Sequence, residues 1–338
     1  MKPFLRWTFV YFIVATAVNT VLRDDALFTA FRVILNTGST PRILFMLLPF
    51  LVVLLALSYR TSDNLKVFAW RIVGSLGALL ICCVFLATFS SLKPTMPFMV
   101  EAAGLPHFFA DPFFADLDNW LHFGVDPWVI THDITHALGL TNFAHHASSL
   151  YSVIWAVPAF YLPVIMVLLG DDKRTVHHFL MLYLFSWVAL GNVVAPAALS
   201  AGPIFYDNIF GTARYTELLP SMMAGGYEGS WFERVQPALW DAYANDQQAV
   251  GSGISAFPSL HVALATMSAL YFVHKARWLA WVAVPFVLAV LFVSVWCGYH
   301  YAIDGYFSIA AILALHWALK RRQAGRDPSS AMAPVAAE

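Results

Sequence analysis

Long runs of apolar residues dominate this chain and restrict what it can fold into. A helix needs about 20 mostly apolar residues to cross the hydrocarbon core of a bilayer. Of the 338 residues, 60% are hydrophobic and only 12% are charged, which is too little charge to cover a water-facing surface. We therefore expect an all-α, polytopic membrane bundle of about eight transmembrane helices. The expected spans are residues 4–22, 41–59, 67–92, 149–169, 177–200, 259–273, 278–297 and 300–319.

The positive charges predict how these spans are oriented. With eight alternating spans, 13 of the 19 Lys and Arg residues fall on the side of the N-terminus and 6 on the other side. The positive-inside rule then places both termini in the cytoplasm. The two long connections, 93–148 and 201–258, fall on the extracytoplasmic side, and loops of such length are usually functional. The net charge of −1 gives no basic excess that would indicate a nucleic-acid partner.

One segment of the first long connection has the pattern of an amphipathic helix. Its apolar residues recur at helical spacing, while polar residues from Asp116 to His122 fill the opposite face. Such a helix suits the membrane interface, and a packed lid helix is the alternative. Asp118 and Asp126 suit a polyol headgroup, with a solvated or capping role as the alternative. The apolar residues are Phe113, Phe114, Leu117, Trp120 and Leu121.

Two histidines stand where apolar spans begin, and ionisable groups in such places are candidates for function. His261 opens the sixth span and His300 opens the eighth, so both lie at the extracytoplasmic end. His300 and Asp304 are four residues apart on one helix face, where a carboxylate holds an imidazole in one tautomer. Ser259 and the free N–H groups of the first helical turn form an anion site. The motifs are Phe257-Pro-Ser-Leu-His261 and Gly298-Tyr-His-Tyr-Ala-Ile-Asp304.

Together these groups suit phosphoryl transfer. One imidazole attacks phosphorus, and the second protonates the leaving oxygen. The alternative is that both histidines only cap helices at the membrane interface. His132 and His136 also share a helix face, as in some metal sites, but no Glu or Cys completes a ligand set and we expect no metal.

The pair of motifs resembles the type-2 phosphatidic acid phosphatase superfamily, in which Pro-Ser-x-His is followed two spans later by His-x3-Asp. The forms Phe-Pro-Ser-Leu-His and Gly-x-His-Tyr-x2-Asp look most like its inositol phosphorylceramide synthase branch. Two further stretches, Ser200–Tyr206 and Asp118–Trp128, look like segments of bacterial members. The resemblance extends from about Lys93 to Leu319.

This resemblance implies roles for the residues of both motifs. His261 would be the general acid, His300 the nucleophile that forms a phosphohistidine, and Asp304 the group that orients His300. It also implies a six-helix catalytic core and an enzyme without metal or other cofactor. The implied location is a bacterial cytoplasmic membrane, with the active site at the extracytoplasmic face.

The chain departs from the phosphatase pattern in its cations. Phosphatases of the superfamily carry an Arg where this chain has Val293 and Ser294, and a Lys-x6-Arg-Pro motif that this chain lacks. Those cations clamp the phosphate, and a buried phosphate needs partners. Lys93 and Arg214 are the candidate replacements. The predicted phosphate- and substrate-binding set is completed by Ser259, Ser200, Gly202 and Tyr206.

We expect four regions along the chain. Residues 1–92 hold N-terminal transmembrane helices, and residues 93–148 form an extracytoplasmic or interfacial segment. Residues 149–322 form the catalytic, phosphatase-like membrane domain. Residues 323–338 are rich in Ala and Pro, so we expect a disordered cytoplasmic tail.

The predicted function is transfer of a phosphoryl group or an inositol-phosphate-like headgroup from a phospholipid donor to a lipid acceptor, through a phosphohistidine. The alternative is a lipid phosphate phosphatase, which acts on phosphatidic acid or a polyprenyl phosphate with water as acceptor. A remote alternative is a proton-coupled transporter, although transporters place such groups near the bilayer midplane. No sequence feature indicates an oligomeric state.

Overall fold

A computed structural model of the chain describes residues 2–23, 41–247 and 253–324, and all regular structure within these ranges is helical. Six stretches in this part of the chain are long and apolar enough to cross a membrane. They confirm the all-α, polytopic membrane architecture that the apolar runs predict. The stretches are Lys2–Leu22, Leu65–Ala102, Phe143–Leu168, Lys173–Ala197, Arg277–Trp296 and Ala302–Ala324.

The other two expected spans also form helices, α3 (Pro41–Arg60) and α15 (Leu260–Lys275). At 1.5 Å per residue, the 16 residues of α15 rise about 24 Å, less than the hydrocarbon core of about 30 Å. The short length of α15 is compatible with its position, because its neighbours on several sides are other helices. They are α9 (Ala156–Leu168), α10 (Lys173–Leu184), α16 (Ala280–Trp296) and α17 (Ala302–Ala324).

Small side chains explain how α15 fits among so many neighbours. Ala263, Ala265, Ser268 and Ala269 are all buried, and small residues let helix backbones approach closely inside a membrane. The Ser268 hydroxyl donates to the backbone oxygen of Leu264, so this buried polar group is satisfied within its own helix. The helix that carries His261 is therefore the packed centre of the bundle.

The N-terminal helices pack on one flank of this centre. Helix α4 (Leu65–Leu92) contacts both α1 (Lys2–Arg23) and α9. Aromatic rings fill the contact, since Phe85 lies 5.8 Å from Phe4, 5.2 Å from Tyr11 and 5.5 Å from Tyr183, measured between ring centroids.

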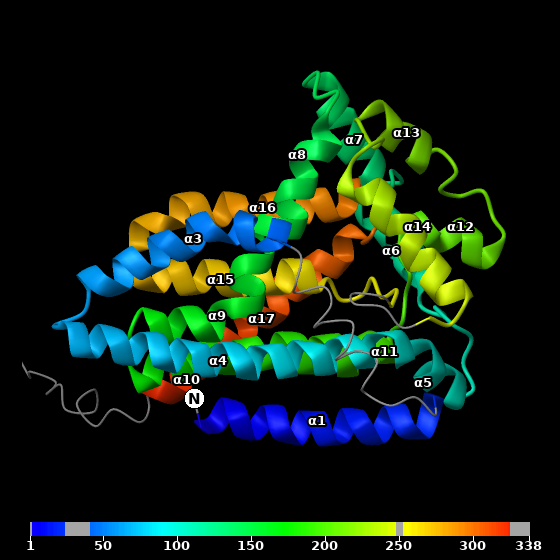
Figure 1. Cartoon of the computed structure of the whole chain (residues 1–338). Coiled ribbons are helices and arrows are strands. Elements are labelled where there is room, and N and C mark those ends of the chain that lie inside the picture. The colour runs from blue at the N-terminus through cyan, green and yellow to red at the C-terminus, as the bar shows by residue number, and fades with distance from the viewer. Residues whose placement is uncertain (1, 24–40, 248–252, 325–338) are drawn as a thin grey trace, which may run out of the picture.

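Both long connections fold into short helices that gather at one end of the bundle, and we call this group the cap (Figure 1). The N-terminal ends of α15 and α17 point toward the cap (Figure 1). His261 and the turn that carries His300 therefore lie beneath it. The cap helices are α5 (Met96–Ala102), α6 (Asp111–Leu121), α7 (Pro127–Ala137), α8 (Phe143–Ser149), α12 (Pro203–Phe210), α13 (Leu218–Ala224) and α14 (Trp231–Ala244).

Helix α6 is the predicted amphipathic helix. Its apolar residues Phe113 and Trp120 are 64% and 73% exposed, as a helix at a lipid interface requires. Its other face is not turned to water, because Asp118 is buried against the start of α17. The Asp118 carboxylate accepts from the backbone N–H groups of Ala302 (2.8 Å) and Ile303 (3.0 Å), which is a capping role.

Helix α17 continues to Ala324, so the first two residues of the expected tail are helical. The rest of that expected segment, 325–338, lies outside the described residues.

Truncation of the buried Phe85 tests the packing between the N-terminal helices and the bundle. Phe85→Ala should lower the free energy of unfolding by about 3 kcal/mol, because it leaves a cavity among the three aromatic rings that Phe85 contacts. Unfolding in mixed micelles of rising denaturing-detergent content measures this change. Leu80→Ala, at a 69% exposed position of the same helix, is the matched control. Equal losses in both variants would contradict the packing.

Candidate active site

His300 is held by a backbone carbonyl in a single tautomer. Its Nδ1 lies 2.7 Å from the oxygen of Ala256 and 3.3 Å from Asp304 Oδ2. A carbonyl oxygen only accepts, so Nδ1 carries the proton and Nε2 keeps its lone pair. Burial lowers the pKa of His300 to about 3, and the nearby Lys93 ammonium acts in the same direction. The ring is therefore neutral near pH 7, and its Nε2 carries no proton.

Asp304 supports the same turn from within α17. Its side chain is fully buried, and Oδ2 accepts from the backbone N–H of Tyr301 at 3.0 Å as well as from His300. The spacing of four residues thus brings the imidazole and the carboxylate together. Asp304 Oδ1 has no hydrogen-bond partner among the described residues.

His261 lies between two aromatic rings. The Tyr151 ring stacks on it with 3.9 Å between centroids, and the Trp155 ring does so at 4.1 Å. The π-helical turn Leu150–Ile154 positions both rings, and Trp155 Nε1 donates to the backbone oxygen of His261 at 2.8 Å. The His261 and His300 rings are 6.2 Å apart between centroids, so one phosphate can contact both.

Lys93 is the cation whose charge acts on both His261 and His300. It follows directly after α4. Within the described ranges, its ammonium makes no hydrogen bond or ion pair with another residue. The backbone of Gly253 passes close to it, since a Cβ at Gly253 would lie 3.0 Å from Lys93 Cγ.

Arg214, the other candidate cation, has partners elsewhere. Its guanidinium lies 2.5 Å from Asp116 Oδ1 and 3.7 Å from Asp126 Oδ1, and it donates to the Ala115 oxygen at 2.9 Å. These partners belong to α6 and the segment after it. The structure therefore ties Arg214 to α6 and the segment after it, whereas the charge of Lys93 acts on both histidines.

The predicted binding segment Ser200–Tyr206 packs on the loops that carry the motifs. The Ser200 hydroxyl accepts from the N–H of Phe257 at 2.9 Å. Gly202 has φ +87°, and a Cβ there would lie 2.4 Å from the Tyr299 oxygen, so only glycine fits. Tyr206 instead contacts Phe210 and Tyr215 within the cap.

Ser259 serves the start of α15. Its hydroxyl accepts from the N–H of Val262 at 3.4 Å, which is a helix cap. Its own N–H donates to the backbone oxygen of Asp304 at 3.3 Å. The two motifs are thus joined by their backbones as well as by the His300–Ala256 bond.

A comparison with known protein families shows which family has this pair of motifs. A family model described as the PAP2 superfamily matches residues 112–318, which include both histidine motifs. This chain belongs to the PAP2 superfamily. No curated protein and no solved structure matches it.

Membership supports a lipid phosphoesterase of the phosphatase or phosphotransferase type, embedded in a membrane and acting on lipid substrates. The inositol phosphorylceramide synthase branch of the superfamily stays a prediction.

Asp111 of this PAP2 protein is a buried carboxylate beside the candidate site that the sequence did not indicate. Its carboxylate accepts from the N–H groups of Ala201 (2.6 Å) and Gly202 (3.0 Å) and from the Tyr301 hydroxyl (2.8 Å). Burial raises the pKa of Asp111 to about 7, while the three donors favour the ionised form. The only signal in the sequence is an Asp-Pro pair that opens an amphipathic helix, which is common to many helix starts.

Three cap helices hold the turn before His300 through its carbonyl oxygens. His132 Nε2, from α7, lies 2.8 Å from the Trp296 oxygen, and Gln236 Nε2, from α14, donates to the Cys297 oxygen at 3.0 Å. The N–H of Ile204, from α12, donates to the Gly298 oxygen at 2.9 Å. The cap therefore fixes the backbone of the turn that carries His300.

His132, which shares a predicted helix face with His136, uses its ring nitrogens for contacts within the protein. Its Nδ1 lies 2.6 Å from Ser221 Oγ, so both ring nitrogens have protein partners. No group of three His, Cys, Asp or Glu side chains in the described part of the chain is arranged to hold a metal ion.

Asp111→Asn tests whether this carboxylate positions the turn that carries His300. An Asn amide turns one acceptor into a donor that faces another donor, so the Ala201–Gly202 loop or Tyr301 must shift. We expect kcat to fall about 10- to 100-fold, since small displacements near reacting groups have effects of that size.

The control for this variant is Asp133→Asn, at an exposed position of α7. Enzyme assays in mixed micelles, with a thermal unfolding curve for each variant, separate lost activity from lost folding. Unchanged kcat in a folded Asp111→Asn protein would contradict the positioning role.

Proposed function

We propose that this PAP2 protein transfers a phosphoryl group or a phospho-headgroup, of the inositol-phosphate kind, from a lipid donor through a phosphohistidine on His300. The reaction takes place at the extracytoplasmic face of a bacterial cytoplasmic membrane, with both termini in the cytoplasm. The observation that supports it best is the 2.7 Å contact between His300 Nδ1 and the Ala256 oxygen. That contact leaves Nε2 unprotonated beside a second histidine.

In the first step, His300 Nε2 attacks phosphorus and the bond from phosphorus to the leaving oxygen breaks. His261, in its protonated form, gives a proton to that oxygen, so the lipid leaves as an alcohol. The phosphorylated imidazole still carries Nδ1–H and is therefore cationic. Asp304 and the Ala256 carbonyl stabilise this charge.

In the second step, an acceptor hydroxyl attacks phosphorus while His261 takes the acceptor's proton. The bond between His300 Nε2 and phosphorus then breaks, and its electron pair returns to Nε2. Both histidines regain their starting protonation states, so the cycle needs no metal and no other co-reactant.

The phosphate oxygens need partners that replace the arginines of the phosphatase pattern. We assign Lys93 and the hydroxyl groups of Tyr151 and Tyr299 to this role. Both hydroxyl oxygens are buried without a hydrogen-bond partner among the described residues, a costly state that a phosphate oxygen would relieve. The Tyr151 ring stacks on His261 and lies 6.3 Å from the Tyr299 ring between centroids.

The surroundings of His261 favour a lipid acceptor over water. Two stacked aromatic rings cover its faces and make its surroundings apolar, which suits the apolar body of a lipid. Hydrolysis shares the first step with transfer, so the acceptor alone distinguishes the two reactions. Release of free phosphate without acceptor would favour the phosphatase alternative.

His300→Ala tests the nucleophile. We expect loss of turnover, because the covalent step has no other group, while folding is preserved. The assay uses purified protein in mixed micelles with a radiolabelled phospholipid donor, with and without a ceramide or diacylglycerol acceptor.

Wild-type protein quenched in an alkaline denaturant should retain label that is stable to base and lost in acid, as expected of a phosphohistidine, and His300→Ala should retain none. Full turnover in His300→Ala would exclude this residue as the nucleophile. A product that forms only with the acceptor identifies a transferase.

Lys93→Met and Tyr151→Phe test the phosphate contacts. A hydrogen bond to a charged group contributes roughly 1.5–3 kcal/mol, so Lys93→Met should lower kcat/KM about 10- to 100-fold. Tyr151→Phe should lower it about tenfold. The matched controls are Lys66→Met and Tyr59→Phe, at exposed positions away from the cap. Changes no larger than those of the controls would contradict the assignment.

A further inference from the structure

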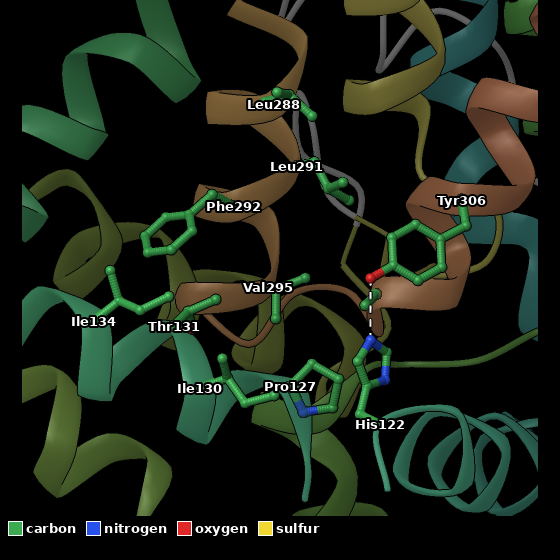
Figure 2. Close-up of a pocket in the computed structure, with 11 residues that line it drawn as sticks. His122, Pro127, Ile130, Thr131, Ile134, Leu288, Leu291, Phe292, Val295 and Tyr306 are labelled. Carbon is green, nitrogen blue, oxygen red and sulfur yellow. Dashed lines mark hydrogen bonds between the residues drawn. The ribbon is translucent and has the colours of Figure 1, made fainter. Parts of the chain in front are cut away.

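A groove of about 310 Å³ lies outside the catalytic site, between α7, α16 and the first turns of α17 (Figure 2). Most of its lining is aliphatic or aromatic. Only His122, Thr131 and Tyr306 contribute polar side chains, and no Lys or Arg is among the lining residues. The apolar lining residues are Pro127, Ile130, Ile134, Leu288, Leu291, Phe292, Val295 and Ala302.

The apolar part of the groove belongs to a candidate membrane span. Leu288, Leu291 and Val295 lie on the second half of α16, within the span Arg277–Trp296. Leu288 is 56% exposed and Ile134 is 44% exposed, so the groove opens outward. An outward-facing apolar groove at membrane depth adjoins the hydrocarbon of the bilayer, and a lipid chain is the apolar group available to fill it.

The polar side chains of the groove present acceptors rather than donors. His122 Nδ1 lies 2.7 Å from the backbone oxygen of Asp118, so it carries the proton, and Nε2 accepts from the Tyr306 hydroxyl at 3.0 Å (Figure 2). The Thr131 hydroxyl already donates to the Trp128 oxygen at 2.8 Å. The hydroxyl oxygens of Tyr306 and Thr131 therefore have lone pairs to offer and no free hydrogen.

This pattern excludes a phosphate headgroup as the natural occupant. Phosphate oxygens only accept, and the Asp118 carboxylate, 3.7 Å from His122 Nδ1, adds negative charge nearby. A hydroxyl group donates, so it complements the acceptors of Tyr306 and Thr131. The groove thus suits a lipid with an uncharged, hydroxyl-bearing head.

We propose that this groove binds a diacylglycerol-type neutral lipid, with an acyl chain along α16 and the free hydroxyl donating to Tyr306 Oη. Ala302 lines the groove and begins α17, two residues after His300. Binding here does not depend on turnover. Its interpretation as a holding site for the alcohol that leaves the donor, or for the acceptor, rests on the proposed function.

Photolabelling of the full-length protein in phosphatidylcholine nanodiscs tests the proposal. The probe is a diacylglycerol with a diazirine at the end of one chain, and mass spectrometry maps the labelled peptides. We expect label on α7 and α16. Unlabelled diacylglycerol should compete about tenfold better than its methyl ether or phosphatidic acid, which lack the free, uncharged hydroxyl. Label elsewhere, or equal competition by phosphatidic acid, would overturn the proposal.

Ile130→Trp fills the groove from α7 at a 39% exposed position, so it should fold normally. It should weaken labelling about tenfold, because the indole displaces roughly two methylene groups of the chain. Val282→Trp, 63% exposed on α16 and outside the lining, is the control and should label as the wild type does. Equal labelling of the two variants would refute the groove. Normal labelling of a protein without transferase or phosphatase activity would instead count against the proposed function alone.

Discussion

The hydrogen bond from His300 Nδ1 to the Ala256 carbonyl is the contact on which the geometry of the candidate site depends. It joins the loop before α15 to the turn before α17, and so it joins the two histidine motifs. It also fixes the tautomer, because a carbonyl oxygen cannot donate. The family resemblance implies that Asp304 orients His300, but its Oδ2 lies farther from Nδ1, at 3.3 Å. The same oxygen also accepts from the backbone N–H of Tyr301. In the mechanism that we propose, the carbonyl keeps the proton on Nδ1, and the carboxylate stabilises the positive charge that develops on the ring.

Two buried carboxylates of α6 connect the loops of the candidate site to the cap. Asp118 caps α17 through two backbone N–H groups, and Asp111 joins the Ala201–Gly202 loop to Tyr301. Burial raises the pKa of both carboxyls, which is the cost of placing charge where water is excluded. Each offsets that cost by accepting hydrogen bonds from groups that would otherwise have no partner. The short helix α6 therefore holds both the turn that carries His300 and the loop beside it.

The sequence predicts those features that depend on local spacing. Apolar runs predict the helices, and the spacing of four residues places Asp304 beside His300. Asp111 was missed because its partner Tyr301 is 190 residues away, and periodicity carries no information on such contacts. The stacking of Tyr151 on His261 was missed for the same reason, since an aromatic residue inside an apolar span is ordinary. Arg214 seemed suitable by its charge alone, and only the fold shows that its partners lie on α6.

The charges around the histidines bear on the kind of phosphate that fits there. In the mechanism that we propose, the positive charge beside the phosphate comes from Lys93 and from His261 while it carries the proton. So few cations would suit a phosphodiester, which carries one negative charge, better than a phosphomonoester dianion, for which the phosphatase pattern supplies further cations. Tyr151 and Tyr299 donate hydrogen bonds without adding charge, so they strengthen binding and leave the number of cations unchanged. A diester donor releases a neutral alcohol, and the groove beside α16 presents acceptors to such a hydroxyl. The transfer that we propose, from a phosphodiester lipid, would account both for the absence of those arginines and for the uncharged groove.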